Sequence, residues 1–268
     1  MIKLLINEQE VKFELTKFPD GTSQVWKLQD DIDFDEYADT PVILWLFENE
    51  GEIMHVLQLA QLVQSHLNTD ECFLRVPYLP HGRQDKKVDN KLSFALTTFK
   101  DILYNANITR IETFDAHSKT DMVYEDSVMP TVQDFHQSIL NQGEHDVVCF
   151  PDKGAATRYR ENFQGASVVY CEKVRDQLTG EILGLNVIGG NHDSLFNKRV
   201  LIVDDICDGG MTFIKVTEAL KQFNPQQVDL AVSHGIFSKG KGVLVDAGIK
   251  NIYTTNSLLR NPEGFKVW

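Results

Sequence analysis

Two adjacent aspartates and a pair of glycines lie close together in the segment VLIVDDICDGGMT, residues 200–212. The carboxylates of Asp204 and Asp205 can accept hydrogen bonds from sugar hydroxyls or hold a metal ion. Gly209 and Gly210 leave the backbone amides of their loop accessible, and such amides favour a bound anion when a helix begins beside them. Carboxylates next to an anion site suit a ligand with both hydroxyls and a phosphate. The segment therefore predicts a site for a phosphorylated sugar.

The residues around this segment predict a strand, a loop and a helix. Residues 200–203 form a continuous apolar run, as expected for a parallel strand that is covered on both faces. Asp204 and Asp205 lie at the carboxyl end of this predicted strand, the edge where open α/β sheets bind ligands. Residues 212–223 have the apolar spacing of a helix. An alternative is an ordinary helix start capped by Asp208, which leaves the two preceding acids unexplained.

Strand-like and helix-like stretches alternate along the rest of the chain. This alternation predicts an α/β protein with mainly parallel sheets and helices on both faces. The polar, turn-like segment at 118–130 predicts a boundary between two domains, residues 1–130 and 131–268. The other predicted strands fall within residues 41–47, 72–79, 108–117, 145–154, 166–176, 228–238 and 251–257.

Composition narrows the classes of function. The chain has 268 residues, of which 42% are hydrophobic and 24% charged, as expected for a globular protein with a packed core. Its net charge of −13 argues against general nucleic-acid binding, which needs a basic surface. The sequence contains no apolar run of membrane-spanning length and does not begin like a signal peptide. The four cysteines form no CxxC pair, so we expect buried, reduced thiols and a cytoplasmic protein.

Seven short segments, in order along the chain, resemble the ribose-phosphate pyrophosphokinases, or PRPP synthetases. The loop VDDICDGGMT resembles the ribose 5-phosphate loop that these synthetases share with phosphoribosyltransferases. The segment VPYLPHGRQDKKV, residues 76–88, resembles only the synthetases, which have the form PYxxYARQDR there. The other matching segments are KFPDGTSQV (17–25), TFDAHSK (113–119), FPDKGAATRYR (150–160), YCEKVRD (170–176) and SHGIFSKGKG (233–242).

The resemblance implies two phosphoribosyltransferase-like (type I) domains, each a mainly parallel sheet flanked by helices, with ATP held mainly by the first. It also implies a role for particular residues of this sequence. The implied ATP contacts are Phe18, Asp20, Arg83, Gln84, Asp85 and Lys86. The implied ligands of Mg²⁺ are His117 and Asp152. The implied catalytic cations are Lys173 and Arg175. The implied ribose-phosphate contacts are Asp204, Asp205, Asp208, Gly209, Gly210, Met211 and Thr212.

The implied reaction transfers the β,γ-diphosphate of Mg²⁺–ATP to the C1 hydroxyl of ribose 5-phosphate and releases AMP. Its partners are small molecules, with no nucleic acid and no membrane, and the resemblance implies a homo-oligomer, a dimer or a hexamer. Such a reaction serves nucleotide biosynthesis. Two rival functions are a transferase that consumes PRPP, which the segment at 76–88 disfavours, and a non-catalytic regulatory subunit, which the presence of Lys173 and Arg175 disfavours.

The phosphate loop departs from the family pattern. The family has DTGGT where this chain has Asp208-Gly209-Gly210-Met211-Thr212, so one hydroxyl donor to a terminal phosphate is missing. A phosphodiester offers fewer free oxygens than a terminal phosphate and needs room for its substituent. One hypothesis is therefore an extended acceptor such as ADP-ribose, with Lys153 near a second phosphate, giving ADP-ribose pyrophosphate and a place in NAD metabolism. The other is that the loop has drifted and ribose 5-phosphate remains the acceptor.

Overall fold

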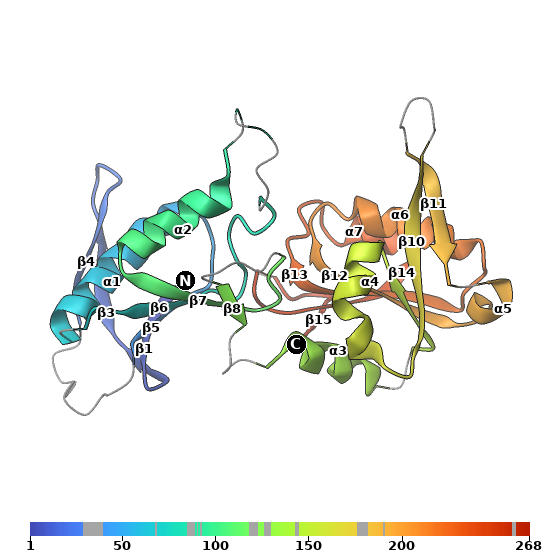
Figure 1. Ribbon diagram of the computed structural model, residues 1–268, viewed down its shortest axis with the longest axis horizontal. Coiled ribbons are helices and arrows are strands. Elements are labelled where there is room, and N and C mark those ends of the chain that lie inside the picture. The colour runs from blue at the N-terminus through green and yellow to red at the C-terminus, as the bar shows by residue number, and fades with distance from the viewer. Residues whose placement is uncertain are drawn as a thin grey trace. The chain divides into compact units, whose positions relative to one another are not determined.

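The computed structural model describes residues 1–28, 40–67, 69–84, 89, 91, 93–117, 123–125, 130–142, 145–175, 182–189, 191–258 and 261–268. The chain divides into two compact units, Met1–Met129 and Pro130–Trp268 (Figure 1). Among the described residues, every helix is too short or too polar to cross a membrane. All four cysteines are free and buried.

The first unit is built on a mixed sheet with the strand order β2-β1-β5-β6-β7-β8. The strands from β5 to β8 are parallel, and β1 runs antiparallel to both of its neighbours. Helix α1 packs against β4, β5 and β6, and α2 packs against β7. The bounds are β1 Ile2–Ile6, β2 Gln9–Val11, β5 Val42–Trp45, β6 Cys72–Arg75, β7 Ile108–Thr113, β8 Val123–Glu125, α1 Ile53–Leu67 and α2 Ala95–Asn105, with a 3₁₀ turn, η2, at Glu50–Glu52.

A separate antiparallel hairpin of this unit joins β3, Phe13–Lys17, to β4, Ser23–Leu28. The hairpin is largely exposed, and Val25 and Leu28 are its buried apolar residues. Gln58 of α1 holds β4 in place, because its side-chain oxygen accepts from Val25 N at 2.8 Å and its amide donates to Ser23 O at 3.0 Å.

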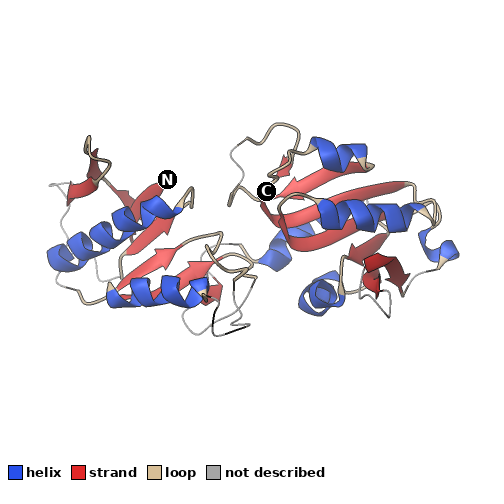
Figure 2. Cartoon of the chain, turned by 90° about the horizontal axis from the view of Figure 1, so that it is seen from above, coloured by secondary structure: helices blue, strands red, loops and turns tan. Residues whose placement is uncertain are grey.

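The second unit is built on a sheet with the order β11-β10-β9-β12-β13-β14-β15, in which β11 is antiparallel to β10 and the other pairs are parallel. Helices lie on both sides of these strands (Figure 2). The strands are β9 Val147–Phe150, β10 Ser167–Arg175, β11 Ile182–Ile188, β12 Arg199–Cys207, β13 Gln227–Gly235, β14 Ile249–Thr254 and β15 Lys266–Val267. The helices are α3 Val132–Leu140, α4 Lys153–Tyr159, α5 His192–Leu195, α6 Met211–Lys221 and α7 Gly242–Asp246, with a 3₁₀ turn, η3, at Arg160–Phe163.

The central strand, β12, extends beyond the apolar run at 200–203 and ends at Cys207. Asp204 pairs with Val232 of β13, and Cys207 pairs with Gly235. The two acids therefore belong to the last part of the strand. Backbone pairing with β13 accepts polar side chains there, because each side chain stands off the sheet and leaves the ladder of hydrogen bonds intact.

The alternative that Asp208 caps the following helix is wrong. The cap of α6 is Gly210, which has φ 79° and makes no side-chain capping bond. A side chain at this position would be strained in the left-handed region, and its Cβ would lie 2.8 Å from Leu244 Cδ2 of α7. The Asp208 side chain instead accepts a hydrogen bond from Ser238 Oγ at 2.6 Å.

Candidate active site of the second unit

The carboxyl ends of the parallel strands in the second unit bring together acids from two elements. Asp204 and Asp205 lie near the end of β12, and Asp152 follows β9 as the N-cap of α4. Since β9 and β12 are neighbouring parallel strands, these acids share one edge of the sheet. The structure thus brings together three of the predicted site residues.

One cation holds this acidic group in place. Arg158 Nη1 of α4 donates to Asp205 Oδ2 at 3.0 Å, and Asp205 is only 5% exposed. Asp205 N in turn donates to Asp204 Oδ1 at 3.0 Å. The guanidinium also lies over the Tyr159 ring, 5.6 Å from its centre. Arg158 was not among the predicted site residues.

Asp204 lies in an environment that disfavours its charge. Burial raises the pKa of the Asp204 carboxyl well above its usual range, and the nearby negative charges of Asp205 and Asp152 raise it further. A ligand that brings hydroxyl donors or a divalent cation relieves this repulsion. The electrostatics of the site therefore suit a sugar diol or a metal-bound polyphosphate.

The donor set at this edge fits a hard cation in part. Asp152 Oδ1 accepts the capping bond from Ala155 N at 2.9 Å, and its carboxylate is otherwise exposed. Mg²⁺ prefers oxygen ligands, needs few from the protein and takes the rest from water and substrate phosphates. Within the described ranges, no group of three or more His, Cys, Asp or Glu residues is arranged to hold a metal ion. Asp152 thus fits one ligand to a cation that a polyphosphate brings with it.

The loop after β12 has the features of an anion site. The N-cap of α6 supplies no side-chain acceptor, so the first amides of the helix remain available to a ligand. Met211 is 53% exposed, and Thr212 is exposed as well. Gly209 lies against the side chain of Lys239, whose Cε would be 3.5 Å from an added Cβ. Lys239 is a second residue of the site that sequence patterns did not single out.

Lys173 lies on the antiparallel pair of β10 and β11, opposite Leu185. Its side chain is exposed. Figure 1 shows this pair of strands reaching beyond the helices of its unit. The side chain of Arg175, the other predicted catalytic cation, lies outside the described residues.

The predicted ATP contacts lie in the first unit. Phe18 and Asp20 form the turn between β3 and β4, where Phe18 N donates to Thr22 O at 2.8 Å. Asp20 Oδ1 accepts from Thr22 Oγ1 at 2.7 Å and from Thr22 N at 3.0 Å. These bonds, the hydroxyl bond first, lower the pKa of the Asp20 carboxyl. Thr22 therefore stabilises this turn.

The remaining predicted contacts of the first unit follow its parallel strands. Arg83 and Gln84 are exposed in the segment after β6, and Gln84 N donates to His81 O at 2.8 Å. Asp85 and Lys86 lie outside the described residues. His117 is exposed after β7, so the two predicted metal ligands, His117 and Asp152, belong to different units.

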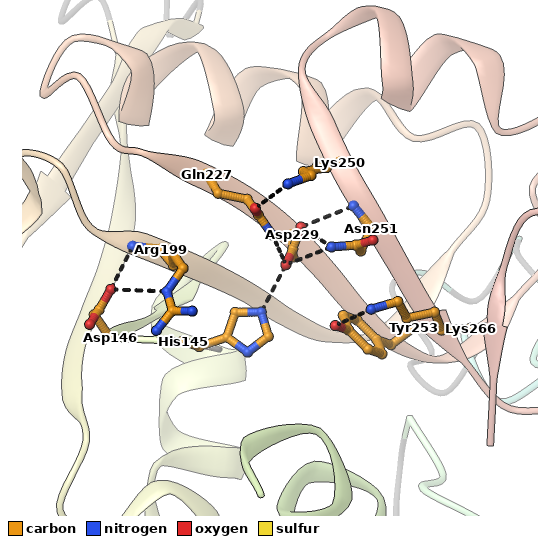
Figure 3. Close-up of polar contacts among 9 residues, drawn as sticks. All are labelled: His145, Asp146, Arg199, Gln227, Asp229, Lys250, Asn251, Tyr253 and Lys266. Carbon is orange, nitrogen blue, oxygen red and sulfur yellow. Dashed lines mark hydrogen bonds and ion pairs between the residues drawn. The ribbon is translucent and has the colours of Figure 1, made fainter. Parts of the chain in front are cut away.

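The opposite edge of the second sheet holds a different polar cluster, shown in Figure 3. Asp229 of β13 is its centre: Oδ2 lies 2.9 Å from His145 Nε2 and accepts from Gln227 Nε2 at 2.7 Å, and Oδ1 accepts from Asn251 N at 2.9 Å. The side chains of His145 and Asp229 are fully buried. The cluster ties the beginnings of β9, β13 and β14 together, away from the acids at the strand ends.

Comparisons with known proteins agree with this arrangement. The phosphoribosyl transferase domain family matches residues 132–265. A ribose-phosphate pyrophosphokinase of Saccharolobus solfataricus is 26% identical over 92% of this chain and 85% of its own length, and one of Sulfurisphaera tokodaii is 25% identical over 96% and 88%. The crystal structure of phosphoribosylpyrophosphate synthetase from Mycobacterium smegmatis has the same fold, with a TM-score of 0.74 at 18% identity over 98% of this chain and 87% of that one. The predicted resemblance to the ribose-phosphate pyrophosphokinases and the predicted α/β fold are confirmed, and the chain belongs to the phosphoribosyl transferase domain family.

Proposed function

We propose that the protein transfers the β,γ-diphosphate of Mg²⁺–ATP to the C1 hydroxyl of a ribose 5-phosphate moiety. The C1 oxygen attacks the β-phosphorus, the bond from that phosphorus to the α,β-bridging oxygen breaks, and AMP leaves with this oxygen. The C1 hydroxyl loses its proton to solvent. The supporting observation is the juxtaposition of Asp204 and Asp205, held by Arg158, with the glycine loop that leads into α6.

Different residues of the second unit bind different parts of the acceptor. Asp204 and Asp205 accept hydrogen bonds from the 2- and 3-hydroxyls and so orient the ring. The loop from Asp208 to Thr212 binds the 5-phosphate through its amides and the start of α6. Arg158 keeps Asp205 in position and offsets part of the negative charge.

The attack on ATP is served by cations. Lys173 neutralises charge that builds on the phosphoryl oxygens in the transition state, and Arg175 is proposed for the same role. Phe18, Asp20, Arg83, Gln84, Asp85 and Lys86 are proposed to bind ATP. Mg²⁺, when bound with ATP, neutralises the polyphosphate, and Asp152 and His117 are its proposed protein ligands. We assign the acceleration to positioning and charge.

A second candidate acceptor is ADP-ribose, in which the 5-phosphate carries a substituent. The structure is compatible with this acceptor, because packing does not dictate two of the altered loop residues. An added Cβ at Gly209 meets Lys239 at 3.5 Å, an ordinary contact distance, and Met211 is 53% exposed. Since the fold requires neither glycine at 209 nor methionine at 211, the ligand can determine which residues stand at these positions. The product would be ADP-ribose pyrophosphate.

The test is AMP release from Mg²⁺–ATP with each acceptor. Release with ribose 5-phosphate alone supports a PRPP synthetase in nucleotide biosynthesis, and release with ADP-ribose alone supports a role in NAD metabolism. A non-catalytic regulatory subunit releases no AMP with either. We also propose a cytoplasmic homo-oligomer, a dimer or a hexamer, and the molar mass in solution tests the assembly.

A further inference from the structure

The segment after β13, residues 236–241, closes over the end of β12. Ile236 N and Phe237 N both donate to Cys207 O, at 2.9 and 3.1 Å. Phe237 has φ 46°, and an added Cβ at Gly235 would lie 2.1 Å from the Phe237 ring, so the path of this segment depends on the glycine. The segment is therefore fixed directly beside the loop that we assign to the 5-phosphate.

Two residues of this segment reach the phosphate loop: Ser238, whose hydroxyl donates to Asp208, and Lys239. The Lys239 side chain passes over Gly209, with Cε 3.5 Å and Cδ 3.6 Å from the position of an added Cβ. The side chain is exposed, and within the part of the chain that the structure describes its ammonium group makes no ion pair or hydrogen bond. An exposed lysine over the phosphate loop is suited to an anionic ligand.

A pocket lies along the same segment, with Ile236 and Phe237, whose amides donate to Cys207 O, in its lining. It has a volume of about 510 Å³ and is lined by residues 235–237, 240 and 241 and by Leu258, Asn261, Glu263 and Phe265. The rings of Phe237 and Phe265 stack in its wall, 4.5 Å apart and inclined by 27°. Lys241 Nζ donates to Glu263 O at 3.3 Å, and the exposed Asn261 brings an amide to its rim. This volume falls within the range of about 300–1,000 Å³ that holds small ligands.

We propose that this pocket binds the part of the acceptor beyond its 5-phosphate, and that Lys239 binds a second phosphate on the way to it. The ligand class is a ribose 5-phosphate joined through its phosphate to a second nucleotide, of which ADP-ribose is an example. The aromatic wall suits a planar base, and the rim offers polar partners to its edge. Free ribose 5-phosphate ends at the phosphate loop and leaves the pocket empty. The inference rests on the assignment of that loop under the proposed function.

Calorimetric binding tests this site with the full chain. The α,β-methylene analogue of ATP is present throughout, so that the ADP moiety of ADP-ribose does not enter the ATP site. We expect ADP-ribose to bind at least about tenfold more tightly than ribose 5-phosphate. Asn261→Trp fills the pocket from its rim, and Lys239→Met removes the charge but keeps the chain over Gly209. Each should weaken ADP-ribose by about tenfold or more.

A control ligand and a control variant distinguish loss of this site from a general loss of folding or binding. Asn261→Trp should leave the affinity for ribose 5-phosphate within about twofold, because that acceptor does not reach the pocket. Lys198→Trp, an exposed lysine just before β12 at the opposite edge of the sheet, should leave both affinities unchanged. Lys153→Met tests the alternative cation at the start of α4, and the proposal expects a smaller loss than for Lys239→Met.

Equal affinities for the two acceptors in the unaltered protein would overturn the proposal. An ADP-ribose affinity that Asn261→Trp leaves unchanged would overturn the pocket assignment, whatever Lys239→Met does. Failure of the proposed function has a different signature. In that case no acceptor yields AMP from ATP, while the binding comparison is measured with an analogue that cannot react and remains informative.

Discussion

Arg158 Nη1 lies 3.0 Å from Asp205 Oδ2, across the gap between helix α4 and strand β12. Asp205 is almost fully buried, whereas the Arg158 side chain keeps a third of its surface exposed. The same helix begins with Asp152 as its cap. One short helix thus sets the positions of a proposed metal ligand and of the cation that holds the proposed sugar-binding acids.

Arg158→Met should impair use of the acceptor more than use of ATP. The change leaves the buried Asp205 carboxylate without its positive partner, so the acids no longer present fixed oxygens to the diol. We expect the KM for the acceptor to rise by about tenfold or more, with the KM for Mg²⁺–ATP within about twofold. Steady-state kinetics of AMP release measure both constants.

Arg160→Met is the matched control for this change, since Arg160 is exposed two residues further on and is not bonded to the acids. It should leave both constants unchanged. Equal kinetic effects of the two changes, or an unaltered acceptor KM in Arg158→Met, would show that the contact with Asp205 is incidental to substrate use.

Lys173→Met should lower the rate of transfer while leaving the affinity for nucleotide nearly intact. The proposed contact of this cation forms with charge that develops in the transition state, and removal of one such contact typically costs about 100-fold or more in turnover. Lys250→Met, an exposed lysine on β14, is the control. Single-turnover AMP formation, with ATP-analogue binding measured separately, distinguishes the two effects. A turnover equal to that of the control would remove Lys173 from the reaction.

His136 should make the second unit sensitive to acid. Burial lowers the pKa of His136 from 6.5 to about 3, and its Nδ1 lies 3.1 Å from Asn162 Nδ2. Below pH 6.5 His136 is protonated in the unfolded chain but remains neutral in the folded chain. The free energy of unfolding therefore has its full value above pH 6.5 and falls as the pH drops toward 3. At pH 5 the loss should be about 2 kcal/mol.

His136→Phe removes this titration and keeps a ring among Phe135, Tyr159 and Phe163. Urea unfolding at pH 7 and pH 5 should show a smaller pH difference in this variant than in the unaltered protein. His66→Gln, at an exposed position in the first unit, should keep the full difference. A pH difference that survives His136→Phe would mean that other groups cause the acid sensitivity.

Asp229→Asn should destabilise the fold without slowing the reaction. The change places an amide among the donors His145, Gln227 and Asn251, which leaves buried donors unsatisfied. We expect a loss of about 2–3 kcal/mol, and a melting temperature lower by roughly 5–10 °C. Turnover at 25 °C should stay within about twofold, because the cluster in Figure 3 lies at the opposite edge from the site. A large loss of turnover with an unchanged melting temperature would contradict this structural role.

The alternation of strands and helices is the part of the fold that the sequence predicts. The continuous apolar run at 200–203 indicates a doubly covered strand, and β12 is that strand. Its extension beyond the apolar run to Cys207 depends on pairing with β13, a tertiary contact that the apolar pattern does not reveal. The exposed strands β3 and β4 are not among the predicted strands, because they have little apolar surface to mark them.

The candidate site likewise contains residues that the sequence predicts and residues that it does not. Asp152, Asp204 and Asp205 lie in recognisable segments, and adjacent parallel strands bring them to one edge. Arg158 and Lys239 are missed because only packing shows their targets. Arg158 reaches Asp205 through the orientation of α4, and Lys239 reaches Gly209 through the segment after β13. The position of a single arginine or lysine in the sequence does not indicate which residue its side chain contacts.

The most direct measurement is AMP release from Mg²⁺–ATP with ribose 5-phosphate and ADP-ribose offered in parallel, with product masses recorded. The proposed chemistry predicts that one of these acceptors gains a diphosphate for each AMP released, and that Lys173→Met abolishes most of this product. ADP in place of AMP, or no nucleotide product with either acceptor, would contradict diphosphate transfer as the function of this protein.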